Sequence, residues 1–298
     1  MIIVKLKGGL GNQMFQYAFG RRIALENNVD FLIDISEFKN DNVYKREYSL
    51  SCFVLIENFA TEKDLKKTKK IIGKNYVSKL IRFANKFKPY YKSYLVYDRS
   101  PQKYDSLLFK NKYKNVYFDG YWQNEKYFKD IEYIIRKDFT FRKNKKNRDN
   151  LKVSEMIKTT NSVALHIRNY GLTYDEKASK RDVEDVGIMK ISYYKDTLKY
   201  LENALNNFRL FIFSDDINWV RDNYNLNYNN IIYVDNVGKD YEQMRLMSLC
   251  KHQIISNSTF SWWAAWLNNN PDKIVIAPKQ WFRNRDTSDL IPKRWIIL

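Results

Sequence analysis

The sequence of 298 residues contains few cysteines and no long hydrophobic run. Its two cysteines, Cys52 and Cys250, stand far apart, so no disulfide framework is indicated and two reduced, largely buried thiols are expected, as in a cytosolic protein. No uninterrupted apolar stretch approaches the roughly 20 residues that a membrane-spanning helix requires. Met1–Lys5 leads straight into a strand-like pattern, so no signal peptide is expected.

Length and composition favour a folded protein of two domains. Hydrophobic residues make up 44% of the chain, which is enough for a core. The formal net charge of +18 fits an anionic partner, which could be nucleic acid, a membrane surface or a phosphorylated substrate. A solvated basic surface would explain much of the same excess. Because the basic residues are scattered and no RRM, KH or helix-turn-helix signature occurs, we expect no nucleic acid partner.

Hydrophobic patterning predicts an α/β chain. Residues 2–7 alternate as a strand, and a glycine turn at 8–13 leads into helical spacing, which is the opening of an α/β unit. Beyond residue 150, strand and helix patterns alternate repeatedly, as in a doubly wound parallel sheet. The elements expected there are strands at 162–165, 210–213, 231–234, 254–255 and 273–277, and helices at 193–208, 217–223, 241–251 and after 258.

A charged run at 142–150 contains no apolar residue and is the best candidate for a domain boundary. We therefore expect domains at 1–145 and 146–298. Residues 74–92 have the pattern of a basic amphipathic helix. Such a helix would pack its apolar face on the first domain or lie on an anionic membrane, and periodicity alone does not separate the two.

Polar residues collect where the predicted strands of the second half end, which is where doubly wound sheets bind ligands. Arg168 suits a diphosphate through bidentate hydrogen bonds, and Asp215 or Asp216 could accept two N–H bonds from a guanine edge. Together with His166, these residues predict a nucleotide-diphosphate pocket. Each also has a structural explanation: an ion pair for Arg168, a helix cap for either aspartate, and a hydrogen-bonded core position for His166.

The stretch 254–267 predicts a buried strand, a hydroxyl-rich turn and a helix capped by Ser256, Asn257 or Ser258. Backbone N–H groups and the positive end of the helix dipole would then point out of the sheet edge. With the hydroxyls of the turn, they make a site for a phosphate or pyrophosphate. An ordinary helix cap is the alternative.

Two stretches of the first half also place polar groups at strand ends. Gly9-x-Gly11 has no third glycine and is a weak nucleotide fingerprint, but residues 11–13 still put two amide side chains beside a strand end. Residues 119–123 gather an aspartate, two aromatic side chains and an amide after another strand, which suits a sugar. Packing of the aromatic rings between strand and helix is the alternative.

In order along the chain, residues 8–18, 119–123, 166–168, 213–216 and 256–263 resemble the motifs of glycosyltransferase family eleven, the inverting α-1,2-fucosyltransferases. The resemblance implies a GT-B fold of class α/β, in which two Rossmann-like domains with parallel sheets face a central cleft. It also implies GDP-fucose on the C-terminal domain, the acceptor mostly on the N-terminal domain, and a reaction without metal or other cofactor. The donor-binding residues would be Gly11, Asn12, Gln13, His166, Arg168, Asp215, Asp216, Ser256, Asn257, Ser258, Thr259 and Phe260, and the acceptor-binding residues Tyr121, Trp122 and Gln123.

The implied activity is transfer of L-fucose to O2 of a terminal β-galactose in a bacterial surface glycan such as an O-antigen. Arg168 would stabilise the leaving group, and Asp119 is a candidate base. A GT-B enzyme with another nucleotide sugar, a basic nucleic-acid-binding protein and an inactive relative are the alternatives. The basic surface fits a cytoplasmic enzyme at the inner face of the membrane with a lipid-linked acceptor, and free oligosaccharides fit equally.

The chain departs from the family pattern after the His-x-Arg element. Asn169 stands where the family has a second arginine, and Gly171 where it has an aspartate. One positive charge near the pyrophosphate is therefore missing, and the role of that carboxylate is vacant. The charged segment that follows has the composition of a mobile loop. Its carboxylates could substitute, and the spacing selects none of them: Asp175, Glu176, Asp182, Glu184 and Asp185.

Overall fold

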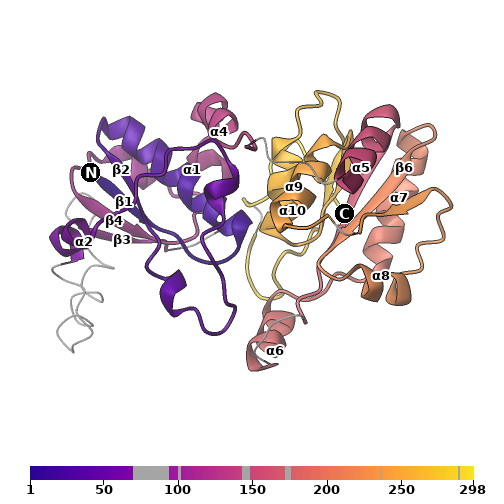
Figure 1. The fold of residues 1–298 in the computed structure, drawn as a ribbon, viewed down its shortest axis with the longest axis horizontal. Coiled ribbons are helices and arrows are strands. Elements are labelled where there is room, and N and C mark those ends of the chain that lie inside the picture. Colours follow the sequence, from indigo (N-terminus) through magenta and orange to yellow (C-terminus); the bar gives the residue numbers. More distant parts are fainter. Residues whose placement is uncertain (70–93, 100–101, 143–147, 172–175, 236, 288) are drawn as a thin grey trace. The chain divides into compact units, whose positions relative to one another are not determined.

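The computed structural model describes residues 1–69, 94–99, 102–142, 148–171, 176–235, 237–287 and 289–298 (Figure 1). The chain forms two compact units, Met1–Thr140 with Ser288–Leu290, and Phe141–Thr287 with Ile291–Leu298. The expected helix at 74–92 and the expected boundary at 145/146 lie outside the described residues. Within the described ranges, no helix is long and apolar enough to cross a membrane.

The first unit is built on a four-stranded parallel sheet in the order β2-β1-β4-β3. Helix α1 begins directly after the glycine turn that follows β1, and its buried face lies on the sheet. The strands are β1 (Ile2–Lys5), β2 (Phe31–Asp34), β3 (Leu95–Tyr97) and β4 (Val116–Asp119). The helices are α1 (Leu10–Asn27), α2 (Glu62–Lys69) and α4 (Glu132–Asp138), with 3-10 turns at Phe38–Asn40, Leu50–Cys52, Ser106–Lys110, Glu125–Tyr127 and Lys129–Ile131.

The second unit contains a six-stranded parallel sheet in the order β10-β9-β8-β5-β6-β7. Its strands are β5 (Ser162–Ile167), β6 (Arg209–Ser214), β7 (Ile231–Tyr233), β8 (His252–Ile254), β9 (Val275–Ala277) and β10 (Ile296–Ile297). Its helices are α5 (Arg148–Thr159), α6 (Glu176–Asp185), α7 (Ile191–Ala204), α8 (Ile217–Asn223), α9 (Asp240–Leu249) and α10 (Thr259–Leu267).

Strand β5 is the centre of this sheet and is buried along its whole length. It pairs with β6 on one side, where Ile167 is opposite Ser214, and with β8 on the other, where Leu165 is opposite Ile254. The chain leaves β5 towards β6 and β7, and later returns to build β8, β9 and β10 on the opposite side. This reversal is the topological switch point at which doubly wound sheets bind their ligands.

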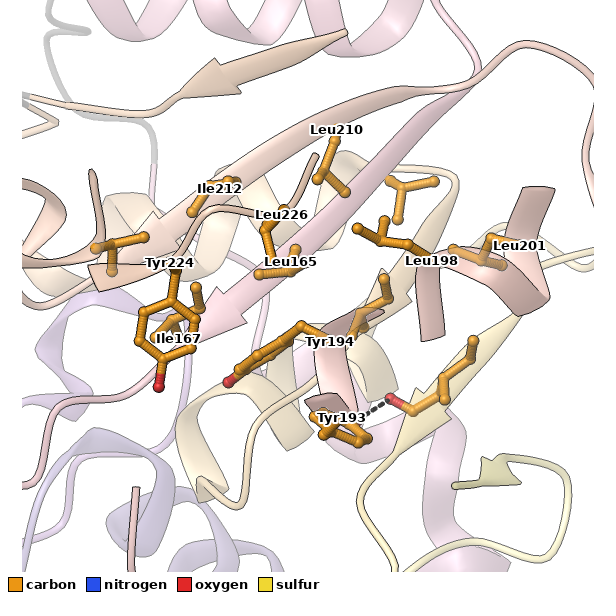
Figure 2. Packing of buried hydrophobic residues seen from close by; sticks show 14 of the residues in the cluster. Leu165, Ile167, Tyr193, Tyr194, Leu198, Leu201, Leu210, Ile212, Tyr224 and Leu226 are labelled. Carbon is orange, nitrogen blue, oxygen red and sulfur yellow. Dashed lines mark hydrogen bonds between the residues drawn. The ribbon is translucent and has the colours of Figure 1, made fainter. Parts of the chain in front are cut away.

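A cluster of aliphatic and tyrosine side chains fixes helix α7 on this sheet (Figure 2). Leu198 and Leu201 of α7 pack with Leu165, Leu210 and other side chains of β5 and β6, because parallel strands covered by helices are apolar on both faces. The hydroxyl of Tyr193 donates a hydrogen bond to the carbonyl oxygen of Ile255 at 2.8 Å. The core therefore reaches the residues that follow β8.

The predicted α/β class with parallel sheets, which the resemblance also implies, is confirmed. Residues 148–150 of the polar run begin α5, and Asn150 there is buried with its Nδ2 hydrogen-bonded to the carbonyl oxygen of Val237 and to Glu242. One expectation in the second half was wrong. The segment read as a mobile loop contains α6, a polar helix that has no apolar stripe to reveal it.

We expect that Gly20→Ala destabilises the protein. Alanine favours a helix interior by about 1 kcal/mol over glycine. A Cβ at residue 20 would nevertheless lie 2.5 Å from Cε2 of Phe31 and would also clash with Val4, so α1 would have to move away from the sheet. Overpacking of this kind costs about 1–3 kcal/mol. Urea denaturation measures the free energy of unfolding, and a variant as stable as the wild type would contradict the close approach.

The matched control is Gly9→Ala, at the N-cap of the same helix. A Cβ there has no neighbour nearer than 3.8 Å, the tip of the Arg46 side chain. The expected change is at most about 1 kcal/mol, which reflects the helix cap alone.

Candidate functional site

A buried histidine ties the two central strands of the second sheet together at their carboxyl ends. Nδ1 of His166 lies 2.8 Å from Oγ of Ser256, and the hydroxyl of Tyr194 donates to the His166 carbonyl at 3.1 Å. Burial, and secondly the nearby charge of Arg168, lower the pKa of His166 to about 3. The imidazole is therefore neutral, and it fixes the turn after β8 against β5.

Arg168 extends from the end of β5 to an aspartate at the end of β6. Its Nη1 lies 2.8 Å from Oδ2 of Asp215, and the backbone N–H of Asn169 donates to Oδ1 of the same carboxylate at 3.0 Å. Burial raises the pKa of Asp215, and Arg168 opposes this rise. The guanidinium carbon lies 5.4 Å from the ring centre of Tyr170, and 24% of the arginine side chain is exposed. A charged, oriented and solvent-accessible fork thus stands at the switch point.

The second aspartate has a different place. Oδ1 of Asp216 accepts the backbone N–H of Trp219 at 2.9 Å and caps helix α8. The structural explanations considered for Arg168, Asp216 and His166 are thus all present in this structure. They occur together at one sheet edge, where His166 contacts Ser256 in the turn before α10.

Helix α10 begins at the carboxyl end of β8. Ser258 is its N-cap, and Oγ accepts the backbone N–H of Phe260 at 3.3 Å. Thr259 and Phe260 form the first turn and are partly exposed. The following turns are anchored by buried tryptophans, Trp262, Trp263 and Trp266. The fixed helix therefore directs its N-terminal N–H groups and the positive end of its dipole out of the sheet edge.

Asn257 joins three distant segments to the start of this helix. Its Nδ2 lies 3.0 Å from the carbonyl oxygens of both Val186 and Gly187 and 3.4 Å from that of Trp281. Its own carbonyl oxygen accepts the hydroxyl of Tyr170 at 2.6 Å. Burial raises the pKa of Tyr170 to about 12, so the hydroxyl keeps its proton. Asn257 is 2% exposed and serves here as a clamp on the loops around the site.

In the first unit, the glycine turn positions two amide side chains. Gln13 is buried and uses its whole amide: Nε2 donates to the carbonyl oxygens of Gly8 and Glu47, and Oε1 accepts the N–H of Ser49. Asn12 lies in the first turn of α1, and its Oδ1 accepts a hydrogen bond from Gln123. Gly11 is buried in the same turn.

Asp119 ends β4 between two lysines that the sequence analysis did not select. Oδ1 lies 2.7 Å from Nζ of Lys7, and Oδ2 lies 3.6 Å from Nζ of Lys5, which also pairs with Glu37. Nζ of Lys7 stands 4.7 Å from the ring centre of Tyr121. The spacing of Lys5, the last residue of β1, and Lys7 was the available signal, because residues two apart in an extended segment lie on the same face.

The two aromatic residues after β4 have opposite surroundings. Tyr121 is partly exposed beside Lys7, whereas Trp122 is 1% exposed and stacks on Phe19 with ring centres 4.1 Å apart. Trp122 has a left-handed backbone, with φ at 53°, and Asp98 accepts its backbone N–H at 2.9 Å. In this structure the faces of the indole are covered by protein, so Tyr121 is the aromatic ring of the pair that remains accessible.

We expect that His166 stays neutral throughout the ordinary pH range. The chain has two histidines, so their ring signals in NMR spectra are easily assigned by substitution. Between pH 8 and 5 the His166 signals should not move, and those of His252, whose pKa burial also lowers, should titrate below about 6.5. Titration of His166 near pH 6.5 would contradict the buried contact with Ser256.

The same shift gives a dependence of stability on pH with a defined sign. The unfolded chain takes up a proton at His166 near pH 6.5, and the folded chain only near pH 3. The contribution of His166 is thus fully present above about 6.5 and is lost as pH falls, by at most about 1.4 kcal/mol per pH unit. Urea denaturation at several pH values should show a shallower loss for His166→Asn than for the wild type.

Comparison with known proteins gives a consistent family and fold. The whole chain, residues 1–298, matches the sequence profile of glycosyl transferase family 11. An α-1,2-colitosyltransferase from Escherichia coli is 34% identical over 308 residues, covering 99% of this chain and 98% of the relative. The O-antigen biosynthesis glycosyltransferase WbnK from Escherichia coli is 29% identical over 326 residues, covering 98% and 99%. A variant of Arabidopsis thaliana FUT1 in complex with GDP has a similar fold, with a TM-score of 0.50, 11% identity, and coverage of 92% of this chain and 69% of that chain.

Proposed function

Because the chain belongs to glycosyltransferase family 11, we propose that it transfers L-fucose from GDP-fucose to O2 of a terminal β-galactose on a glycan acceptor. The transfer proceeds with inversion at the sugar and without a metal ion. The acceptor belongs to a bacterial surface glycan such as an O-antigen. The enzyme works in the cytoplasm on a lipid-linked or free oligosaccharide, and its basic surface favours contact with the anionic inner face of the membrane.

One observation carries this proposal: the switch point of the second sheet combines an arginine with a helix N-terminus. Arg168 at the end of β5 and the first turn of α10 after β8 stand on neighbouring parallel strands. Both favour negative charge, the arginine through its N–H donors and the helix through the backbone N–H groups of its first turn and its dipole. A diphosphate is the ligand that this pair fits best. We propose that Asp215, which also binds Arg168 and the N–H of Asn169, accepts N–H groups of a guanine base.

The same groups account for catalysis. In an oxocarbenium-like transition state the GDP leaving group gathers negative charge. Arg168 and the start of α10 are held in place before the reaction, by Asp215 and by the buried tryptophans, so that little reorganisation is needed as the charge develops. Neutral His166 and Ser256 contribute by holding the turn after β8 against β5, because Nδ1 of His166 and Oγ of Ser256 are hydrogen-bonded to each other.

The base that receives the acceptor proton is less constrained by the structure. Asp119 remains our candidate, and its Oδ1 also accepts a hydrogen bond from Nζ of Lys7. Among the carboxylates near α6, Glu176 pairs with Lys180 and Asp185 pairs with Arg285. On the acceptor side we propose Tyr121 for stacking on the sugar, because its ring is partly exposed beside Lys7.

A second donor is favoured by a specific finding. The relative that is 34% identical over nearly the full length is named for transfer of colitose, a 3,6-dideoxyhexose. Colitose lacks the 3-hydroxyl of fucose, so a pocket for one sugar accommodates most of the other. The two donors are distinguished by kcat/KM, because a site built to bond the 3-hydroxyl rejects the sugar that lacks it.

We expect that Arg168→Ala lowers kcat by at least about 10²-fold, the effect of removing one preorganised donor to a developing charge. Turnover is measured with GDP-fucose and a galactoside at saturating concentrations. Near-wild-type turnover would exclude Arg168 from the reaction.

Arg221→Ala is the matched control, because it removes an arginine from a surface ion pair of the same unit. Nη1 of Arg221 lies 3.4 Å from Asp235, and both side chains are more than 40% exposed, at 43% and 41%. Such pairs contribute little, so kcat should stay near the wild-type value. Unfolding curves of both variants check that neither effect comes from loss of the fold.

The overall proposal is tested by incubating the wild-type protein with lactose or N-acetyllactosamine and either GDP-fucose or GDP-colitose, in EDTA. We expect an α-1,2-linked product and no loss of rate compared with added Mg²⁺. Turnover of neither donor, together with failure to bind GDP, would overturn the site. GDP binding without turnover would instead mean that the sugar or the acceptor is wrong.

A further inference from the structure

Three side-chain amides form a chain of hydrogen bonds across the carboxyl edge of the first sheet. Nε2 of Gln102 donates to Oε1 of Gln123 at 3.2 Å, and Nε2 of Gln123 donates to Oδ1 of Asn12 at 2.9 Å. We call these three side chains the amide relay. Gln102 follows β3, Gln123 follows β4, and Asn12 follows β1, and these strands are neighbours in the sheet. The relay therefore runs from the outermost strand inwards to the start of α1.

Because the two glutamine side chains are buried, the orientation of each amide depends on the orientation of its neighbour. Gln102 and Gln123 are each 5% exposed, so water does not readily replace a lost partner. A side-chain amide has an acceptor at one end and a donor at the other. If Gln102 turns a donor towards Gln123, then Gln123 turns a donor towards Asn12. The orientation of the first amide thus sets that of the last.

At its inner end the relay turns a donor towards the glycine turn. Because Oδ1 of Asn12 accepts from Gln123, Nδ2 faces Gly8, and a Cβ at residue 8 would lie only 2.6 Å from that nitrogen. Gly8 also has φ at 75°, a conformation that glycine adopts without strain. The missing side chain at residue 8 is what allows the amide nitrogen of Asn12 to approach the backbone of the turn.

We propose that Gln102 and Gln123 are positioning residues that hold the Asn12 amide with its N–H groups directed at the β1–α1 turn, where Asn12 donates to a substrate oxygen. The inference rests on the proposed function and on the donor-binding role that the family resemblance implies for Asn12. A fixed N–H group stabilises an oxygen that gains negative charge in the transition state. An Asn12 amide turned the other way would present Oδ1 and repel that oxygen.

This role differs from direct contact of Gln123 with the acceptor. Oε1 and Nε2 of Gln123 each already have a partner inside the relay, and the side chain is buried. Gln102 is one hydrogen bond further from the turn. An effect of Gln102 on the reaction must therefore pass through Gln123 and Asn12.

Two near-isosteric substitutions reverse the inner end of the relay. In Gln102→Glu, the carboxylate offers only acceptors, so Gln123 must turn Nε2 towards it and Oε1 towards Asn12. In Gln123→Glu, the carboxylate accepts from both neighbours and keeps both hydrogen bonds. In either variant Asn12 must turn Nδ2 away from Gly8. Because burial raises the pKa of a glutamate, the variants are assayed at several pH values, and the loss of kcat should grow as the pH rises and the carboxylate ionises.

We expect each variant to lower kcat by at least about tenfold, with a smaller change in KM, because the lost interaction belongs to the transition state. Gln102→Met, which removes the outer donor without supplying an acceptor, should lose less than Gln102→Glu. In an Asn12→Ala background, Gln102→Glu and Gln123→Glu should cause no further loss of kcat. This non-additivity is what a merely structural role would not produce.

The comparison is made with whichever donor and acceptor the wild type turns over. If the proposed sugar is wrong, the wild type fails to turn it over. If the relay is wrong, only the ratios of kcat between the variants and the wild type differ from those expected. Wild-type kcat in both glutamate variants, or the same fold loss with and without Asn12, would overturn the relay. Thermal unfolding of every variant separates loss of the fold from loss of the reaction.

Discussion

The parallel pairing of β5 with strands on both sides is the constraint on which the candidate site depends. Because the chain leaves β5 in one direction and returns on the other, the residues after β5, β6 and β8 meet at one edge although they are separated by up to 90 positions, the separation of His166 and Ser256. The contact between those two side chains closes the edge. Arg168 and the start of α10 then stand beside each other on a rigid base.

Much of this arrangement could be predicted from the sequence. Alternating strand and helix patterns indicate a parallel sheet, and in any such sheet the residues that follow the strands share one edge. That rule alone placed His166, Arg168, Asp215 and the turn after β8 together. The capping preference of serine and asparagine limited the N-cap of α10 to three candidates, of which the structure has Ser258. Sequence patterns were sufficient to predict the position of a residue wherever its main contacts are with a neighbouring strand of the sheet.

The rest depended on partners that local patterns do not reveal. Trp122 has the kind of aromatic ring that stacks on sugars. Its backbone is left-handed, however, and its ring stacks on Phe19 in the core. The polar helix α6 has no apolar stripe, and its end is held by backbone contacts to residue 283. Asp119 lies close to Lys7 because β4 pairs with β1 in the sheet. The spacing of residues along the chain does not predict which strands pair. Long-range geometry, and not residue type, decided these positions.

The hydrogen bonds of the Asn257 clamp restrict which substitutions the surrounding loops can accept during evolution. Its side chain donates to main-chain oxygens of residues 186, 187 and 281, and main-chain oxygens are supplied by every amino acid. Residue 257 must therefore remain an asparagine. The residues that it binds can change in identity, and only the length and course of their loops are restricted. Those loops can thus vary in sequence during evolution while Arg168 and the start of α10 stay unaltered.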